Sequence, residues 1–274
     1  MTIRIISVFL LILSLLTVVP PPSNIFWKIS ILSTEWGHIF GILTLILLII
    51  FLKKRGTFNR VAAFILFLAT VLFLYPLSSA FSVESKNRNE FENHFGAIET
   101  SNSSIDVFHL FSFKTHKSVY KTLKYSSKNN LDMDFYPAKR SQKSPCIVVI
   151  HGGGWDSGDS HQLQDLNHHL AIKGYSVASI NYRLAPRFSY PDPVEDVKEA
   201  LLYLKLNSNN LNIDTSRIVL LGRSAGGQIA LQAAYTLNNK NIRGVIAFYT
   251  PSDMVWGYSL PGNPLILDSR KVLC

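Results

Sequence analysis

The chain has 274 residues, with 27 lysines and arginines against 18 aspartates and glutamates, and a formal net charge of +9. This length predicts one or two domains. The positive charges are scattered over loops without a nucleic-acid-binding motif, which argues against nucleic acid as a partner and favours attraction to anionic lipid headgroups. The two cysteines, Cys146 and Cys274, lack metal-ligand spacing, and we expect neither a metal ion nor an organic cofactor.

Three apolar stretches dominate the first 83 residues: 5–19, 36–52 and 61–77. A helix needs about 20 mostly apolar residues to cross the hydrocarbon core of a membrane. The third stretch reaches this length through Val83, whereas the second is short unless residues 29–32 belong to it. We therefore predict a membrane region of about three transmembrane helices over residues 1–83. A secretory signal in place of the first helix is the alternative, although the prolines that follow offer no cleavage site.

A short basic loop without acidic residues separates the second and third stretches. Its positive residues are Lys53, Lys54, Arg55 and Arg60. Because short cytoplasmic loops are enriched in Lys and Arg, this loop predicts a cytoplasmic position, and the residues after the third helix then lie on the extracytoplasmic side. His38 lies inside the second stretch, where an ionisable group could be functional. We interpret it as a histidine at the membrane edge beside Trp36.

The composition changes from apolar to polar after the third stretch. Residues 84–118 show no clear period and are expected to form a linker that leads into a soluble domain, residues 119–274. Within the linker, Asn102-Ser103-Ser104 matches a glycosylation acceptor, which matters only in a eukaryotic secretory setting.

The soluble domain alternates between strand-like and helix-like segments. Two segments with period-2 alternation precede short apolar runs of the kind that are buried on both faces of a sheet. The expected strands are residues 120–126, 131–137, 146–152, 175–183, 217–222 and 244–250. The first expected helix covers residues 161–173 and ends at Gly174. The second is opened by Pro193 and carries an apolar stripe of Val194, Val197, Leu201 and Leu204. The third runs from Ser224 to about Leu237. This order predicts an α/β fold, with a mostly parallel sheet and helices on both faces.

The first motif with chemical meaning is Gly222-x-Ser224-x-Gly226, between a buried strand and a helix. Bulky side chains at the glycine positions would clash in so tight a turn, and the serine is pushed out at the carboxyl edge of the sheet. The helix that follows points its N-terminal amides and positive dipole end at the site. The pattern alone is weak evidence, but in this strand–turn–helix setting it indicates a nucleophilic serine.

The second motif is His151-Gly152-Gly153-Gly154-Trp155, at the end of an earlier buried strand. Consecutive glycines let backbone N–H groups approach a substrate oxygen, and each donor to an oxyanion is worth about 3 to 4 kcal/mol in a dry site. A phosphate-binding loop is disfavoured, because the chain has neither a GK[ST] sequence nor a GxGxxG after a strand. A plain structural turn is the other alternative.

Four motifs occur in one order along the chain: HGGGW (151–155), NYRLAP (181–186), PDPVEDV (191–197) and GRSAGG (222–227). In this combination the chain resembles the α/β-hydrolase superfamily, and within it the hormone-sensitive-lipase-like carboxylesterases and lipases, over roughly residues 119–270. The resemblance implies an α/β-hydrolase fold with Ser224 as nucleophile. It implies that the oxyanion donors are the N–H groups of Gly153, Gly154 and Ala225. It also implies scaffold roles for Tyr182, Arg183 and Asp196, and a loop-shaping role for His151.

The catalytic base is missing from its expected place. The triad of this family follows the chain order Ser, Asp or Glu, then His, and none of the eight histidines lies after Ser224. We therefore expect a hydrolase domain that is incomplete at its C-terminus and lacks its last strands. Asp253 stands where some α/β-hydrolases hold their acid, but it has no histidine to orient. Two further groups are interpreted as surface features: Asp268, and the helix residues His161, Asp165, His168 and His169, which could otherwise mimic a metal site.

We predict a membrane-anchored serine hydrolase of carboxylic esters that works through an acyl-serine intermediate. The expected substrate is a small-molecule or lipid ester. Because the base is missing, we expect weak activity from this chain. Two alternatives stay open: a catalytically inactive pseudo-hydrolase or binding protein that kept the pocket, and a peptidase of the same fold.

Overall fold

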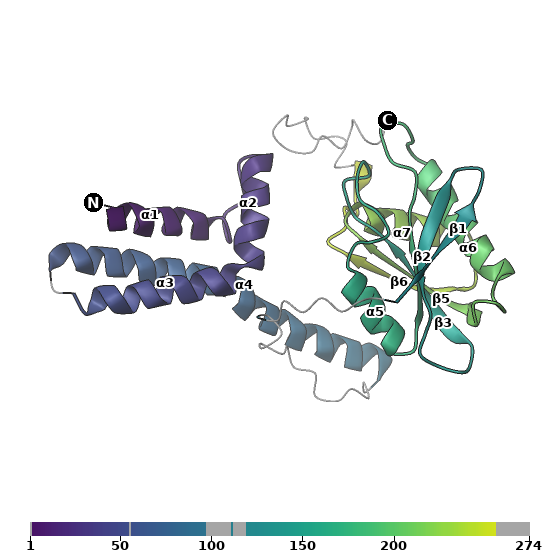
Figure 1. Cartoon of the computed structure of the whole chain (residues 1–274), viewed down its shortest axis with the longest axis horizontal. Coiled ribbons are helices and arrows are strands. Elements are labelled where there is room, and N and C mark those ends of the chain that lie inside the picture. The colour runs from purple at the N-terminus through teal and green to yellow at the C-terminus, as the bar shows by residue number, and fades with distance from the viewer. Residues whose placement is uncertain (1, 55, 97–110, 112–118, 256–274) are drawn as a thin grey trace. The chain divides into compact units, whose positions relative to one another are not determined.

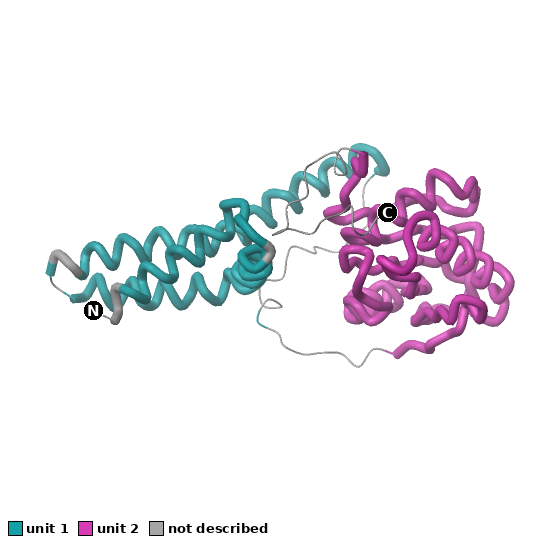
Figure 2. Tube along the Cα trace, turned by 90° about the horizontal axis from the view of Figure 1, so that it is seen from above, with its two compact units in different colours: residues 1–112 teal, residues 113–274 magenta. Residues whose placement is uncertain are grey.

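The computed structural model describes residues 2–54, 56–96, 111 and 119–255. The chain divides into two compact units, residues 1–112 (unit 1) and residues 113–274 (unit 2), which are coloured separately in Figure 2. The described part of unit 1 is helical, and unit 2 is an α/β unit (Figure 1).

The helices of unit 1 are α1 (Thr2–Leu15), α2 (Asn24–Glu35), α3 (Gly37–Leu52) and α4 (Thr57–Phe95). α3 and α4 form an antiparallel hairpin, and α1 runs beside α4 (Figure 1). A Cβ on Gly37 would lie 2.6 Å from the carbonyl oxygen of Phe73, so only glycine permits this approach of the two helices. Thr70 also donates a buried 2.9 Å hydrogen bond to Thr44 across the hairpin. Small residues and interhelical hydroxyl bonds of this kind are typical of helices that pack within membranes.

Pro76 lies inside α4. Because proline has no N–H, the carbonyl of Leu72, four residues earlier, lacks its helical partner. The Thr17 hydroxyl, from the segment after α1, donates to that carbonyl oxygen at 3.0 Å. A neighbouring segment thus satisfies a polar group that water could not reach in an apolar bundle.

One helix of the described residues, Asn59–Phe95, is long and apolar enough to cross a membrane. Helices Ile25–Glu35 and Gly37–Leu52, which meet at 74°, would give a second span only if the bent pair crosses as one. The apolar helix Ile5–Leu15 is too short to count as a span. The expectation of about three transmembrane helices is therefore not confirmed. At about 1.5 Å per residue, the 14 residues of α1 and the 16 residues of α3 extend about 21 and 24 Å, which is less than a hydrocarbon core of about 30 Å.

α4 also continues past the expected end of the membrane region. Residues 84–95, which we expected to belong to an irregular linker, are helical. Two ion pairs with i,i+4 spacing lie along this part, Arg88 to Glu84 at 2.7 Å and Lys86 to Glu90 at 3.9 Å. Such a solvated helix has no apolar stripe from which the sequence could predict it.

Unit 2 contains a six-stranded sheet of order β1-β2-β4-β3-β5-β6 within the described residues. The strands are β1 (Lys121–Ser126), β2 (Leu131–Tyr136), β3 (Ser144–Ile150), β4 (Ser176–Ile180), β5 (Ile213–Arg223) and β6 (Ile242–Phe248). β2 is antiparallel to β1 and β4, whereas β4, β3, β5 and β6 are parallel. The predicted α/β fold with a mostly parallel sheet is confirmed, although β5 begins at Ile213, before the predicted strand.

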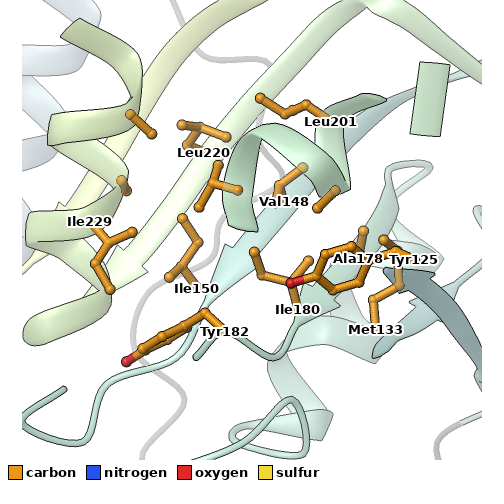
Figure 3. Close-up of a cluster of buried hydrophobic side chains, with 14 of the residues drawn as sticks. Tyr125, Met133, Val148, Ile150, Ala178, Ile180, Tyr182, Leu201, Leu220 and Ile229 are labelled. Atoms are coloured by element: carbon orange, nitrogen blue, oxygen red, sulfur yellow. The ribbon is translucent and has the colours of Figure 1, made fainter. Parts of the chain in front are cut away.

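Helices cover both faces of this sheet. They are α5 (Gln164–Ile172), α6 (Asp192–Leu206) and α7 (Ala225–Thr236). On one face, Leu220 of β5 belongs to a buried cluster with Leu201 of α6 and Ile229 of α7 (Figure 3). On the other face, Val149 of β3 shares a cluster with Ala171 of α5. The side chains of the strands therefore alternate between two apolar layers, and the sheet lies between these layers.

Candidate active site

The two glycine-rich motifs meet at one edge of the sheet. β3 and β5 are parallel neighbours, and Ile150 of β3 pairs with Gly222 of β5. The segments that follow these strands therefore emerge together at the carboxyl edge, where open α/β sheets place their ligand sites. The structure thus brings together residues 151–155 and Ser224, which lie far apart in the sequence.

Ser224 stands on a sharp turn between β5 and α7. Its backbone has φ 51° and ψ −121°, a conformation that side chains rarely adopt. Its N–H donates to the Phe248 carbonyl at 3.0 Å, and its carbonyl accepts bonds from Gly227 N–H at 3.0 Å and Thr250 Oγ1 at 3.1 Å. The turn is therefore held from both sides by α7 and the end of β6, with the serine half-buried.

Two glycines allow the segments to meet. A Cβ on Gly226 would lie 2.2 Å from the Ile150 carbonyl oxygen, which is closer than any side chain could approach. A Cβ on Gly152 would lie 3.0 Å from the Arg223 carbonyl oxygen and 3.4 Å from the Ser224 Cβ. The first turn of α7 therefore packs directly on the end of β3, and the glycine-rich loop lies against the serine.

The loop after β3 leaves backbone donors free. Gly153 has φ +133°, and its carbonyl accepts bonds from the N–H of Ser157 at 3.1 Å and from its hydroxyl at 2.7 Å. Within the described residues, the N–H groups of Gly153, Gly154 and Ala225 donate to no backbone carbonyl. These are the three groups that we expected to form an oxyanion hole, and they lie on the two segments that meet at Ser224.

His151 lies inside the protein behind this loop. Its ring is 1% exposed and stacks on Tyr182 with a centroid separation of 4.2 Å. Its Nδ1 lies 2.8 Å from the Gly152 carbonyl oxygen, and the Tyr182 hydroxyl donates to the His151 carbonyl at 3.2 Å. Burial lowers the pKa of His151, so the ring is neutral. Its burial and these contacts suit a residue that shapes the loop.

Arg183 and Asp196 form a buried ion pair near the site. The Arg183 guanidinium contacts both Asp196 carboxylate oxygens, at 2.8 and 3.0 Å, and also bonds Asp192 at 2.8 Å. The Asp196 carboxylate also accepts the Arg183 backbone N–H at 2.8 Å. Burial raises the pKa of Asp196, and the Arg183 contacts oppose that rise. The pair ties the segment after β4 to the start of α6, as expected of scaffold residues.

Arg223, the residue before the serine, is a feature that sequence reasoning missed. It is 5% exposed, and its Nε and Nη2 groups have no hydrogen-bond partner among the described residues. Burial lowers the pKa of its guanidinium. The sequence carried one signal, a charged residue at the end of an apolar strand.

A mainly apolar pocket of about 530 Å³ lies beside the glycine-rich loop. Its walls include Trp155, Phe188, Tyr190, Val194, Ile229 and Met254, with the amides of Gln228 and Gln232. Ser224 is not among the wall residues. Two wall residues lie near the motifs in sequence: Trp155 ends the glycine-rich loop, and Gln228 lies one helical turn after the serine. The Trp155 indole N–H donates to Gln228 Oε1 at 3.2 Å. Trp155 belongs to a motif of the sequence and Gln228 follows the serine at i+4 spacing, whereas no motif marks Phe188 or Tyr190.

The remaining candidates lie elsewhere or outside the described residues. His161 is largely exposed and lies 3.6 Å from Asp134 and 3.5 Å from Asp159. Across the described ranges, no three His, Cys, Asp or Glu side chains gather as a metal site would require. Asp253 is exposed. Asp268 and Cys274 fall outside the described part of the chain, as does the glycosylation pattern at residues 102–104.

Comparisons with known proteins agree with this geometry. The BD-FAE family model matches residues 131–259. The probable carboxylic ester hydrolase LipM of Mycobacterium tuberculosis is 36% identical over 117 residues, which is 42% of this chain and 27% of LipM. Carboxylesterase NlhH of the same species is 37% identical over 98 residues, which is 35% of this chain and 30% of NlhH. These matches therefore span less than a third of the relatives' own length.

Among solved structures, the hyperthermophilic esterase from the archaeon Pyrobaculum calidifontis has 24% sequence identity and a TM-score of 0.49, with 57% of each chain covered. Strands β2 to β6, the serine turn and the glycine-rich loop all fall within residues 131–259, the part that matches the family model. Residues 131–259 are accordingly similar to the α/β-hydrolase carboxylesterases.

Proposed function

We propose that unit 2 is a serine hydrolase of carboxylic esters. The observation that carries this proposal is the strained serine turn next to a loop whose N–H groups at Gly153 and Gly154 donate to no backbone carbonyl of the described residues. Ser224 Oγ would attack the ester carbonyl carbon, and the resulting oxyanion would accept hydrogen bonds from Gly153, Gly154 and Ala225. Collapse of this intermediate breaks the bond to the alcohol, and water then hydrolyses the acyl-serine.

The attack requires a base that takes the serine proton. None of the histidines in these 274 residues follows Ser224, and His151 lies behind the glycine-rich loop, 1% exposed and stacked on Tyr182. Loss of the histidine in a serine-protease triad lowers kcat by about 10⁶-fold. The reactivity of Ser224 therefore depends on a base. The observation that favours the second candidate function, a binding protein, is the pocket itself, whose walls do not include Ser224.

The pocket supports an uncharged, apolar substrate group. Its aromatic and aliphatic walls favour an acyl or alcohol group without charge, and its volume of about 530 Å³ is that of a small-molecule site. The amides of Gln228 and Gln232 offer hydrogen bonds to one or two polar atoms of that group. Small-molecule or lipid esters fit this description.

Unit 1 is proposed to anchor the protein in a membrane with the hydrolase domain on the extracytoplasmic side. Large apolar side chains on the outer faces of α1, α3 and α4 are exposed, among them Phe9, Ile46, Phe64 and Phe67. A protein in water rarely exposes so continuous an apolar surface. The basic residues Lys53 and Lys54 after α3 support a cytoplasmic position for that end of the bundle.

A fluorophosphonate probe tests the serine directly, because it phosphonylates only an activated hydroxyl. We expect labelling of the full chain in detergent that is abolished in Ser224→Ala, together with slow hydrolysis of p-nitrophenyl acyl esters. No label on folded protein, judged by near-UV circular dichroism, would contradict the hydrolase. In that case, saturable binding of an apolar ester would favour the binding protein. Faster cleavage of peptide anilides than of esters would instead indicate a peptidase.

A further inference from the structure

α2 departs from the direction of the other helices of unit 1. It meets α3 at 74°, with the break at Trp36. α1, α3 and the first part of α4 run beside one another, whereas α2 lies across the end of this group (Figure 1). That end is opposite the basic loop between α3 and α4, because α2 follows the C-terminus of α1 and precedes the N-terminus of α3.

Ser33 marks the side of α2 that faces the bundle. Ser33 is fully buried, and its hydroxyl donates to the Ile29 carbonyl at 2.8 Å. Ile29 and Ser30, on the same face by their spacing, are half-buried. The buried Ser33 hydroxyl is therefore satisfied within α2 itself.

The side of α2 that points away from the bundle carries the charges. Lys28 and Glu35 are both exposed and, seven residues apart, share one face of the helix. Within the described residues from Ile5 to Leu52 they are the only two charged side chains. A pair of charges in the hydrocarbon core would be costly, so this face suits water.

Apolar side chains occupy both flanks between these two faces. Ile25 is 71% exposed and Leu32, seven residues later, 53%. Trp27 and Ile31, four residues apart on the opposite flank, are 51% and 43% exposed. Trp36 follows at the break and is also exposed. Tryptophans prefer the depth at which lipid headgroups meet acyl chains.

We propose that α2 is an interfacial helix that lies in the plane of the extracytoplasmic leaflet, with its flanks in the boundary between headgroups and acyl chains. Trp27 and Trp36 fix its depth, while Lys28 and Glu35 remain in the aqueous headgroup layer. The partner of this surface is thus the lipid bilayer itself. The inference rests on the membrane anchoring proposed for unit 1 and is independent of the esterase activity.

The test is a depth profile of the full chain in vesicles of phosphatidylcholine and phosphatidylglycerol. Nitroxide labels are placed on single cysteines at positions 25–35 in a Cys274→Ser background. Cys146 can stay, because it is buried and burial raises its pKa to about 12. The background protein without an added cysteine should take up no label. Power-saturation EPR with oxygen and a nickel chelate then gives the depth of each label.

An interfacial helix predicts depths that oscillate with a period of 3.6 residues and show no net trend. Labels at positions 28 and 35 should be shallow, and labels at positions 25, 27 and 32 should lie at the acyl boundary. A steady increase in depth from 25 to 35 would show a spanning segment, and uniform exposure to the nickel chelate would show a helix in water. Either result would overturn the proposal.

Labels at Leu45 and Leu68, exposed positions of α3 and α4, separate this inference from the anchoring on which it rests. If both report the bilayer centre while α2 shows no oscillation, the interfacial helix alone is wrong. If neither enters the bilayer, the membrane anchor is wrong as well.

Discussion

Ser224 holds a backbone conformation that glycine adopts with less strain. Its φ of 51° and ψ of −121° lie where a Cβ is disfavoured, and its side chain makes no capping bond to α7. We predict that Ser224→Gly raises the free energy of unfolding by about 1 kcal/mol, since relief of strain exceeds the added flexibility of the unfolded chain. Ser224→Ala keeps the Cβ and serves as the control. Thermal unfolding of the two variants side by side measures this, and equal melting temperatures would contradict it.

Arg183, which is half-buried, and Arg223, which is buried, are in opposite situations. Arg183 bonds two carboxylates, whereas Nε and Nη2 of Arg223 have no partner among the described residues. We predict that Arg183→Met lowers the free energy of unfolding by about 3 to 5 kcal/mol, because it leaves the Asp196 carboxylate buried and unpaired. Arg223→Met should leave stability unchanged or raise it, because an unpaired guanidinium is costly to bury. Denaturant unfolding measures the stability of both variants. A similar loss of stability in both would contradict the conclusion that Arg183 is paired and Arg223 is not.

Single residues were predictable where a motif imposes backbone geometry. The sequence motifs predict the glycines at 152 and 226 and the serine between strand and helix, because the contact is too tight for larger residues at the glycine positions. The state of Arg223 and the walls formed by Phe188 and Tyr190 did not follow. These features depend on contacts between segments that are distant in the sequence, and a local sequence pattern does not predict such contacts.

At the scale of elements, the contact between β3 and the first turn of α7 sets the site. We predict that Gly226→Ala destabilises unit 2 by about 3 kcal/mol, because its Cβ would lie 2.2 Å from the Ile150 carbonyl oxygen. Gly244→Ala in β6 is the matched control, since nothing lies within 4 Å of its Cβ position, and should raise stability by about 0.5 kcal/mol. Urea unfolding of both variants measures the difference. An unchanged midpoint for Gly226→Ala would mean that α7 can shift away from β3.

Elements with a buried face were predicted well, and elements without one were not. The strands of unit 2 and the stripe of α6 followed from apolar periodicity. The extension of α4 over residues 84–95 depends on exposed ion pairs, and the bend at Trp36 leaves no trace in hydropathy. Hydropathy measures how apolar a stretch of sequence is. It does not predict the direction of a helix in space or the residue at which a solvated helix ends.

At the scale of the whole molecule, the basic loop and the hydrolase domain should lie on opposite sides of the membrane. We predict that a membrane-impermeant maleimide labels Lys128→Cys on intact cells, because Lys128 is an exposed residue of unit 2. Lys54→Cys, in the basic loop, should be labelled only after permeabilisation. Both changes are made in the Cys274→Ser background. Labelling of Lys54→Cys on intact cells would reverse the orientation, and equal labelling of both positions would argue against a membrane barrier between them.

The strained serine turn also bears on the history of the chain. Under random substitution, a position that prefers glycine drifts toward glycine unless something selects against it. A lineage that had long abandoned its chemistry would be expected to relax the turn, since most sequences that preserve the fold would do so. A serine held at φ 51° costs stability that glycine would restore, which is the pattern of a side chain retained for its chemistry.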